Sequence, residues 1–136
     1  MTQTMFNLTK HMVFKNLQTI SSDMKAVRSN MKAKQWVLNN ANKIPRQAQI
    51  DSIESMYDLD YHKYFTLCCI YAVVKHTEDE EAAIILNKYP LDRIMLAISE
   101  ELHGTKRFEK VLETFSELMD VPEIEAYRNY NDIKDY

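Results

Sequence analysis

The histidines and cysteines have the widest chemical repertoire in this sequence, and their spacing argues against a shared site. The four histidines are far apart in the chain: His11, His62, His76 and His103. No two stand four residues apart, the spacing that places two zinc ligands on one face of a helix. Cys68 and Cys69 are adjacent, and adjacent cysteines rarely meet the geometry of a relaxed disulfide. His62 and Cys68 do not share a helix face, so the sequence predicts no Cys-His nucleophile. From the spacing of the histidines and cysteines we also expect no metal and no cofactor.

The carboxylates do not indicate a catalytic site either. An acidic run at residues 78–81 follows His76, but acids at the start of a helix are explained by capping and by the helix dipole. A single glycine is too few for a glycine-rich phosphate loop. We therefore expect a protein that is not an enzyme. An enzyme with an unrecognised helical active site is the least favoured functional hypothesis. It requires that His62, His76 or His103 meets a carboxylate in a cleft.

Composition indicates a single, all-helical unit. The chain has 136 residues, of which 46% are hydrophobic, with only one glycine and three prolines for turns. No segment resembles a secretory leader, and no apolar run approaches the ~20 residues that a membrane span needs. The neighbouring cysteines fit a reducing compartment. We therefore expect a soluble, cytoplasmic protein without membrane contact.

The longest expected element is an N-terminal helix with a heptad seam, since its apolar residues recur in alternating steps of three and four. The seam residues are Val13, Leu17, Ile20, Met24, Val27, Met31 and Leu38. No glycine or proline interrupts this tract before Pro45, so the helix is expected to run from about Asn7 or Thr9 to about Asn42. This length exceeds what a compact domain of this size needs, which favours some intermolecular use.

Two lysines share this seam and bear on how far it is buried. Lys10 and Lys34 fall on the same stripe as the apolar residues, and a charge inside a dry interface sets register or marks where the interface ends. The segment from Val13 to Met31 is therefore the expected buried part. It can pack on the rest of the chain or form a coiled-coil homodimer.

The remaining sequence predicts five or six shorter helices. The second is expected to stop or kink at residues 58–60, where Asp60 would cap a buried third helix over residues 61–75. Residues 77–80 fit a capping box, and Gly104 suits a left-handed helix end. Further helices are expected to start near Pro90, Thr105 and Asp120. The predicted fold is thus an all-α bundle of six or seven helices, with residues 1–44 as a long basic helix and residues 45–136 as a compact acidic bundle of the same unit.

Charge is divided unevenly along the chain. Residues 1–49 hold eight Lys and Arg against one acid, whereas residues 50–136 hold nine against nineteen. The basic helix can therefore attract phosphates or an acidic partner, or it can pack on the acidic half of its own chain. The predicted partner-binding residues are Lys15, Lys25, Arg28, Lys32, Gln35, Trp36, Asn39, Lys43 and Arg46.

These features lead to a first and a second functional hypothesis. The first is a non-catalytic adaptor or inhibitor that docks on a larger protein or nucleoprotein assembly, with a protein partner and a homodimer as its expected associations. The Asn-, Lys- and Tyr-rich composition resembles that of small phage proteins that act on host machinery, although no motif carries the likeness. The second is a nucleic-acid-binding protein that uses the basic helix with little sequence preference.

Overall fold

The computed structural model describes residues 17–40 and 47–134, and every regular element among them is helical. In chain order they are α3 (Leu17–Asn39), α4 (Gln47–His76), α5 (Asp79–Lys88), the 3-10 helix η2 (Leu91–Arg93), α6 (Ile94–Leu102), α7 (Lys106–Met119) and α8 (Pro122–Lys134). The predicted all-α, multi-helix bundle is confirmed. None of these helices has both the length and the apolar character that crossing a bilayer requires.

Helix α3 is the described part of the predicted N-terminal helix. It ends at Asn39, slightly before the predicted end at Asn42. The Asn40 backbone N–H and side-chain amide both donate to the Trp36 carbonyl, at 3.2 and 2.7 Å, and close its last turn. The predicted start of the helix and the seam residue Val13 lie outside the described residues.

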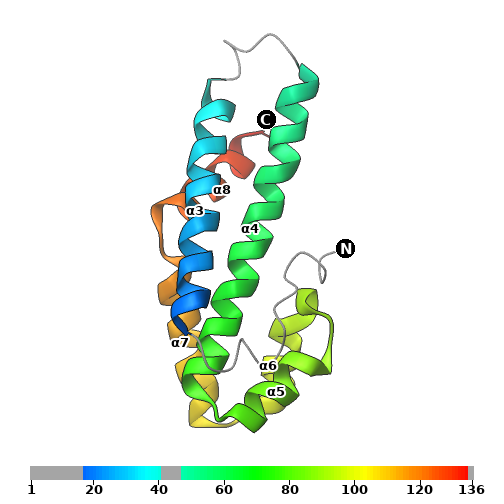
Figure 1. The fold of residues 1–136 in the computed structure, drawn as a ribbon, viewed down its shortest axis with the longest axis vertical. Coiled ribbons are helices and arrows are strands. Elements are labelled where there is room, and N and C mark those ends of the chain that lie inside the picture. The colour runs from blue at the N-terminus through cyan, green and yellow to red at the C-terminus, as the bar shows by residue number, and fades with distance from the viewer. Residues whose placement is uncertain (1–16, 41–46, 135–136) are drawn as a thin grey trace.

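Helices α3 and α4 form an antiparallel hairpin, and the other helices pack around it (Figure 1). Among the predicted seam residues, Leu17 is half-buried and five are buried: Ile20, Met24, Val27, Met31 and Leu38. Helix α4 carries a matching heptad row in which every residue is buried or half-buried: Ile50, Ile53, Tyr57, Asp60, Tyr64, Leu67, Tyr71 and Val74. The Lys34–Asp60 ion pair joins these two rows across the hairpin. The seam of α3 is therefore occupied by the α4 helix of the same chain.

The predicted break at residues 58–60 is wrong. Helix α4 passes through them as one helix of 30 residues. Asp60 caps no helix; it is buried in the seam, where its carboxylate accepts a hydrogen bond from the Lys34 ammonium. The interface also continues past Met31, because Leu38 is buried one turn beyond Lys34. Lys34 is thus a partnered member of the seam and does not mark its end.

The predicted capping box at residues 77–80 is also absent. The Thr77 hydroxyl donates to the Val73 carbonyl at 2.6 Å, back along α4. Glu78 occupies the N-cap position of α5 and makes no side-chain capping bond. A helix does begin at Asp79, as predicted, and three acids in its first turn favour that start through the helix dipole.

The predicted role of the single glycine is confirmed at the end of α6. Gly104 has φ of +82°, a left-handed conformation that is strained for residues with a Cβ. The chain then turns directly into α7, whose N-cap Thr105 accepts a hydrogen bond from the Phe108 backbone N–H at 3.2 Å. This tight connection sets the path of α7 along α4.

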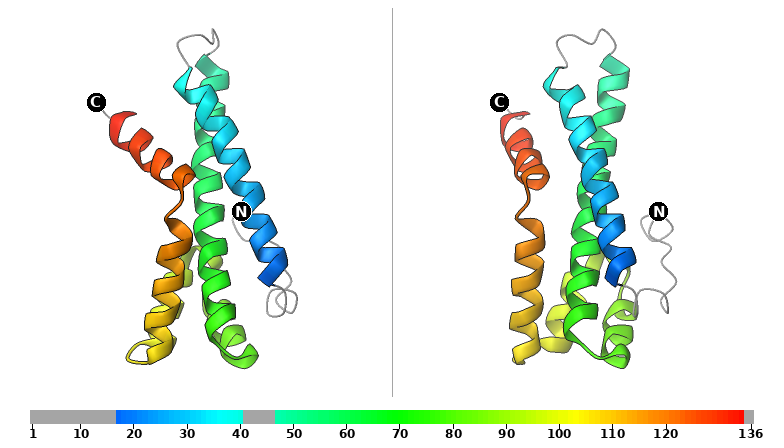
Figure 2. Two further views of the ribbon diagram at one scale, coloured as in Figure 1. Left: turned by 90° about the vertical axis from the view of Figure 1, so that its left-hand side faces the viewer. Right: turned by 60° about the vertical axis from the view of Figure 1, so that its left-hand side comes forward.

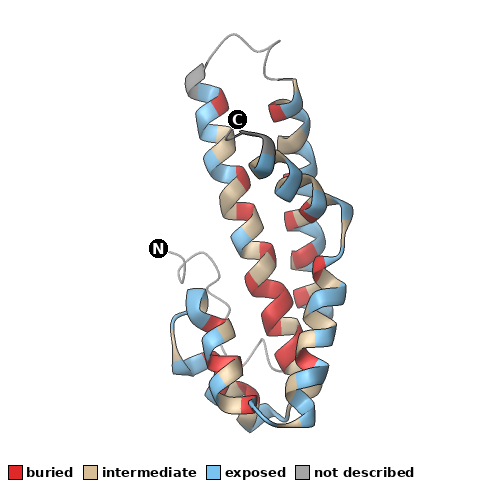
Figure 3. Cartoon of the chain, turned by 180° about the vertical axis from the view of Figure 1, so that it is seen from behind, coloured by how far each residue is buried: buried red, intermediate tan, exposed pale blue. Residues whose placement is uncertain are grey.

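Helices α7 and α8 run along the hairpin one after the other, and α8 diverges from it toward its own C-terminus (Figure 2). Ile124 of α8 is completely buried. The Tyr127 ring stacks on Tyr57 and Tyr61 of α4, with centroids 5.1 and 4.3 Å away, and its hydroxyl donates to Asp58. One aliphatic anchor and an aromatic stack therefore hold α8 on the hairpin. Figure 3 shows that buried residues are densest where α4 passes the shorter helices.

Candidate interaction surface

The outward side of α3 brings the predicted partner-binding residues of this helix onto one surface. We name it the outer stripe and define it by six residues: Lys25, Arg28, Lys32, Gln35, Trp36 and Asn39. In the heptad of α3 they occupy three adjacent rows away from the a/d seam. Arg28 and Gln35 are half-buried, and the other four are exposed. Lys15, Lys43 and Arg46, which were predicted with them, lie outside the described residues.

Trp36 is the most prominent apolar side chain of the outer stripe. It is 65% exposed, more than any other large hydrophobic side chain in the described part of the chain. It stands opposite the seam, whose nearest member Leu38 is only 8% exposed. No helix of the described part of the chain covers this tryptophan. Burial of an exposed indole ring in an interface is favourable, so Trp36 can contribute to the binding of a partner.

Part of the basic charge of α3 is neutralised within the chain. Arg28 forms a two-pronged pair with Glu123 of α8, with Nε–Oε2 and Nη2–Oε1 distances of 3.0 and 3.3 Å. Burial opposes ionisation of Glu123, but the hydrogen bonds from Arg28 and from its own backbone, together with the charges of Arg28 and Lys32, lower the pKa of this carboxyl. Lys34 is matched by Asp60. Among the described residues, Lys25 and Lys32 form no ion pair, so they carry the charge of the outer stripe.

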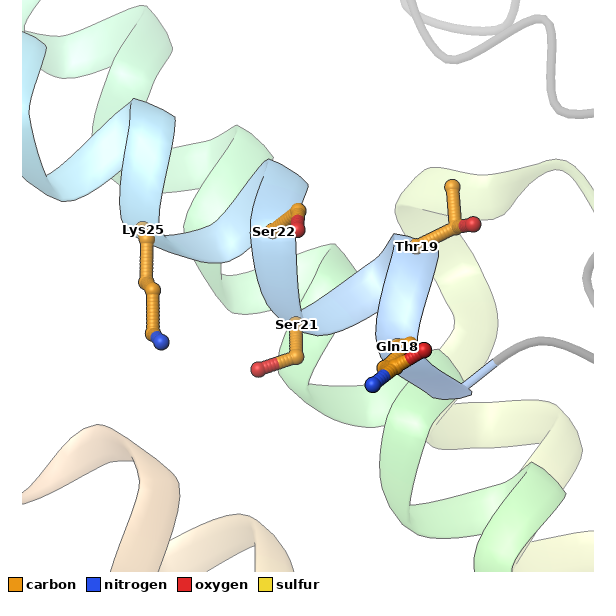
Figure 4. A pocket seen from close by; sticks show the side chains of 5 residues that line it. All are labelled: Gln18, Thr19, Ser21, Ser22 and Lys25. Atoms are coloured by element: carbon orange, nitrogen blue, oxygen red, sulfur yellow. The ribbon is translucent and has the colours of Figure 1, made fainter.

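A shallow hollow of about 430 Å³ continues the outer stripe toward the start of α3. Its described lining comes entirely from this helix: Gln18, Thr19, Ser21, Ser22 and Lys25. Figure 4 shows Gln18, Ser21 and Lys25 pointing to the same side of α3, whereas Thr19 points away from them. The polar groups of the hollow include the hydroxyls of Ser21 and Ser22, the Gln18 amide and the Lys25 ammonium. Its lining is too open and too weakly charged to hold a small ion by itself.

A second hollow, of about 470 Å³, is lined by both a histidine and a carboxylate, the combination that a helical active site would need. It lies between α4 and η2, and both His62 and Asp92 line it. No ion pair or hydrogen bond between these two is among the interactions of the described residues. The remaining lining is mainly apolar and includes Leu59, Phe65 and Leu91. Tyr61 and Thr66 complete the described lining.

The other two described histidines, His76 and His103, each contact a side chain of α7. The His76 ring nitrogen Nε2 lies 2.6 Å from the Thr114 hydroxyl, and burial together with the nearby Lys75 ammonium lowers the pKa of this histidine. His103 is exposed and contacts the edge of Phe108, with ring centroids 6.1 Å apart. Neither histidine lines either of the two hollows described above. His11 lies outside the described residues.

The two cysteines are free thiols inside the core. Both are completely buried, and Cys69 Sγ lies 3.5 Å from Met95 Sδ. Burial raises the pKa of Cys68 to about 12 and raises that of Cys69 as well. Thiols held in the neutral form are poor nucleophiles and poor metal ligands. Within residues 17–40 and 47–134, no three His, Cys, Asp or Glu side chains gather to hold a metal ion.

Sequence reasoning missed several residues that shape this surface. Glu123 and Tyr127 position α8 against the hairpin, and no local pattern indicates this because their partners are distant in the chain. Gln18 and Ser21 were detectable, since Gln18 falls on the heptad row of Lys25 and Ser21 on that of Arg28. Comparison of the chain with protein-family models, with curated proteins and with solved structures gives no match. Inferences about function therefore rest on the chemistry of the described surface.

Proposed function

We propose that this chain is a non-catalytic binding protein that docks on a larger protein or nucleoprotein assembly through the outer stripe. The observation that carries the proposal is the 65% exposure of Trp36 beside the unpaired Lys32 and the amides of Gln35 and Asn39. Tryptophan is strongly enriched among the residues that dominate binding energy at interfaces. Helix α3 is held along its length by α4, so it presents this residue on a rigid support.

The charge distribution favours a protein partner over nucleic acid. Arg28 and Lys34 are paired within the chain, which leaves Lys25 and Lys32 as the unpaired cations of the described α3. Backbone-directed nucleic-acid binding depends on many simultaneous phosphate contacts. One exposed indole is also not the series of aromatic platforms on which single-stranded bases stack.

The proposal includes two finer expectations. A homodimer would have to use a surface other than the α3 seam, because α4 occupies that seam. The phage-type role rests on the Asn-, Lys- and Tyr-rich composition of the chain, and it would make the partner a component of the host machinery in the cytoplasm. Light scattering of the purified chain tests the first expectation, and identification of the partner tests the second.

The test uses Trp36 as its own reporter, because it is the only tryptophan in the sequence. A partner captured from lysate of the source cell should shift the emission of Trp36 to shorter wavelength as the ring leaves water. Trp36→Ala should abolish capture of that partner. Ile84→Ala is the matched control, because Ile84 is also a large exposed hydrophobic residue, 54% exposed, but lies on α5.

The proposal fails if the captured partner binds Trp36→Ala and the native chain equally well. It also fails if Ile84→Ala abolishes capture while Trp36→Ala does not. Binding of a labelled duplex oligonucleotide at ~50 mM salt, where phosphate contacts are strong, would favour the nucleic-acid hypothesis instead.

A further inference from the structure

We infer that the partner segment recognised by the outer stripe is an acidic helix, bound to α3 in the way that α8 is bound within the chain. This inference rests on the proposed function and specifies its partner. One helix with an acidic first turn, α8, already lies against the same side of α3. Glu123 and Glu125 are the acids of that turn.

The contact between α3 and α8 shows which chemistry this surface accepts. Glu123 receives two hydrogen bonds from Arg28, and the positive charge of Lys32 further favours its ionised form. The guanidinium and carboxylate groups meet in the two-pronged arrangement that gives directional recognition as well as charge neutralisation. The two residues are 95 positions apart in sequence, so this is a tertiary contact between two separate helices. In effect, α8 is an intramolecular ligand of the basic helix.

Helix α8 fills only part of the available surface. Lys25 is exposed and lies one turn before Arg28, at the edge of the polar hollow that also contains Gln18 and Ser21. Lys32 is exposed one turn after Arg28. The two unpaired ammonium groups are therefore on the same row of α3, two turns apart, or roughly 10 Å along the axis.

This spacing matches a helical ligand. Carboxylates seven residues apart on a partner helix are separated by the same two turns, so both ion pairs can form in one register. The only acid of the described α3, Asp23, lies on the opposite flank of the seam and does not oppose such a ligand. The amides of Gln18 and Gln35 can donate further hydrogen bonds to carboxylates at either end. Trp36 then contributes apolar contact at the edge of the charged row.

The test measures binding of a labelled helical peptide of three heptads, with glutamates seven residues apart on one face, to the full chain at low salt. Lys25→Glu combined with Lys32→Glu should weaken binding about tenfold, because each surface pair contributes modestly and the two add. Glu123→Gln should strengthen binding by about threefold, because it releases Arg28 for the peptide. Far-UV circular dichroism checks that each variant is folded.

Two controls separate this interaction from nonspecific attraction. Lys106→Glu combined with Lys110→Glu makes the same change of net charge on exposed residues of α7, and should leave binding unchanged. A peptide with glutamine in place of each glutamate should not bind. Equal binding by native chain and by the Lys25/Lys32 variant would overturn the inference, as would tighter binding of duplex DNA than of the acidic peptide.

The inference can fail while the proposed function holds. If Trp36→Ala abolishes capture of the native partner and the Lys25/Lys32 variant still captures it, then the stripe is used but its partner is not acidic. If neither variant affects capture, the proposed function itself is wrong. If both variants lose the partner and the acidic peptide responds as expected, the two proposals are supported together.

Discussion

The seam and the outer stripe are two sides of α3, and the basic residues on the two sides differ in their surroundings. In the seam, Lys34 is half-buried and forms an ion pair with the buried Asp60. On the outer stripe, Lys25 and Lys32 remain in solvent without an ion-pair partner among the described residues. Arg28 lies between these extremes, since its half-buried side chain binds Glu123. The comparison shows that a basic helix can serve its own fold and an external partner with different residues of the same tract.

The largest expected effect breaks the seam. Ile20→Asp places an unpaired carboxylate at a position that is 1% exposed, and should lower the free energy of unfolding by about 4 kcal/mol. Urea denaturation followed by circular dichroism measures this change. Ser29→Asp adds the same charge on the exposed side of α3 and should change stability by less than about 0.5 kcal/mol. Similar losses for the two variants would mean that the two sides of α3 are not distinct.

The buried ion pair gives the next largest effect. Asp60→Ala leaves Lys34 without its partner in the seam and should cost about 2 kcal/mol. This is less than for a fully enclosed pair, because the Lys34 side chain retains 19% exposure. Replacing both residues, Lys34→Met with Asp60→Leu, should recover the loss, since apolar pairs of similar volume fit a heptad seam. Failure of the double variant to recover stability would show that the pair also specifies the register of the hairpin.

A third variant removes a buried polar atom from α4. The Tyr57 hydroxyl is buried and has no hydrogen-bond partner among the described residues, and burial raises the pKa of this tyrosine to about 12. Tyr57→Phe should therefore leave stability unchanged or raise it by up to about 1 kcal/mol. Thermal denaturation measures the change. A clear loss of stability would indicate that the hydroxyl does have a partner in solution.

A fourth prediction concerns acid and the contact between the stripe and α8. The pKa of Glu123 is lowered in the folded chain, so its contribution is fully present above the ordinary glutamate pKa of 4.5 and is lost as pH falls through the lower folded-state value. Glu123→Gln should cost at most about 1 kcal/mol at neutral pH. It should also reduce the loss of stability seen below pH 4.5 in denaturation experiments. An acid-unfolding profile identical to that of the native chain would contradict this assignment.

The smallest expected effect belongs to the outer stripe itself. Trp36→Ala should change the free energy of unfolding by less than about 0.5 kcal/mol, because the ring is mostly in solvent. Its effect is expected on binding and not on folding. A loss of more than about 1 kcal/mol would place Trp36 among the residues that support the fold, and would remove the main reason to treat it as a binding residue.

The parts of the fold that sequence predicted were those specified by local pattern. The period of the apolar residues located the seam, and the single glycine located the turn between α6 and α7. The prediction failed where the same residue type can serve either as a helix cap or in another contact. Asp60 has the chemistry of an N-cap, but it is buried opposite a lysine 26 residues away, and no local signal indicates this. Thr77 likewise has the chemistry of a capping box and instead bonds back to α4.

By itself, the sequence determined that the chain is helical, that α3 has one apolar side and one polar side, and that basic residues outnumber acidic ones eight to one in residues 1–49. These properties follow from residue type and spacing, which act within a few turns. Only the tertiary structure decided that α4 covers the seam, that Asp60 and Glu123 neutralise Lys34 and Arg28, and that Trp36 stays in solvent. Each of these depends on which helix lies alongside α3, because burial and charge pairing are set by neighbours that are distant in the chain.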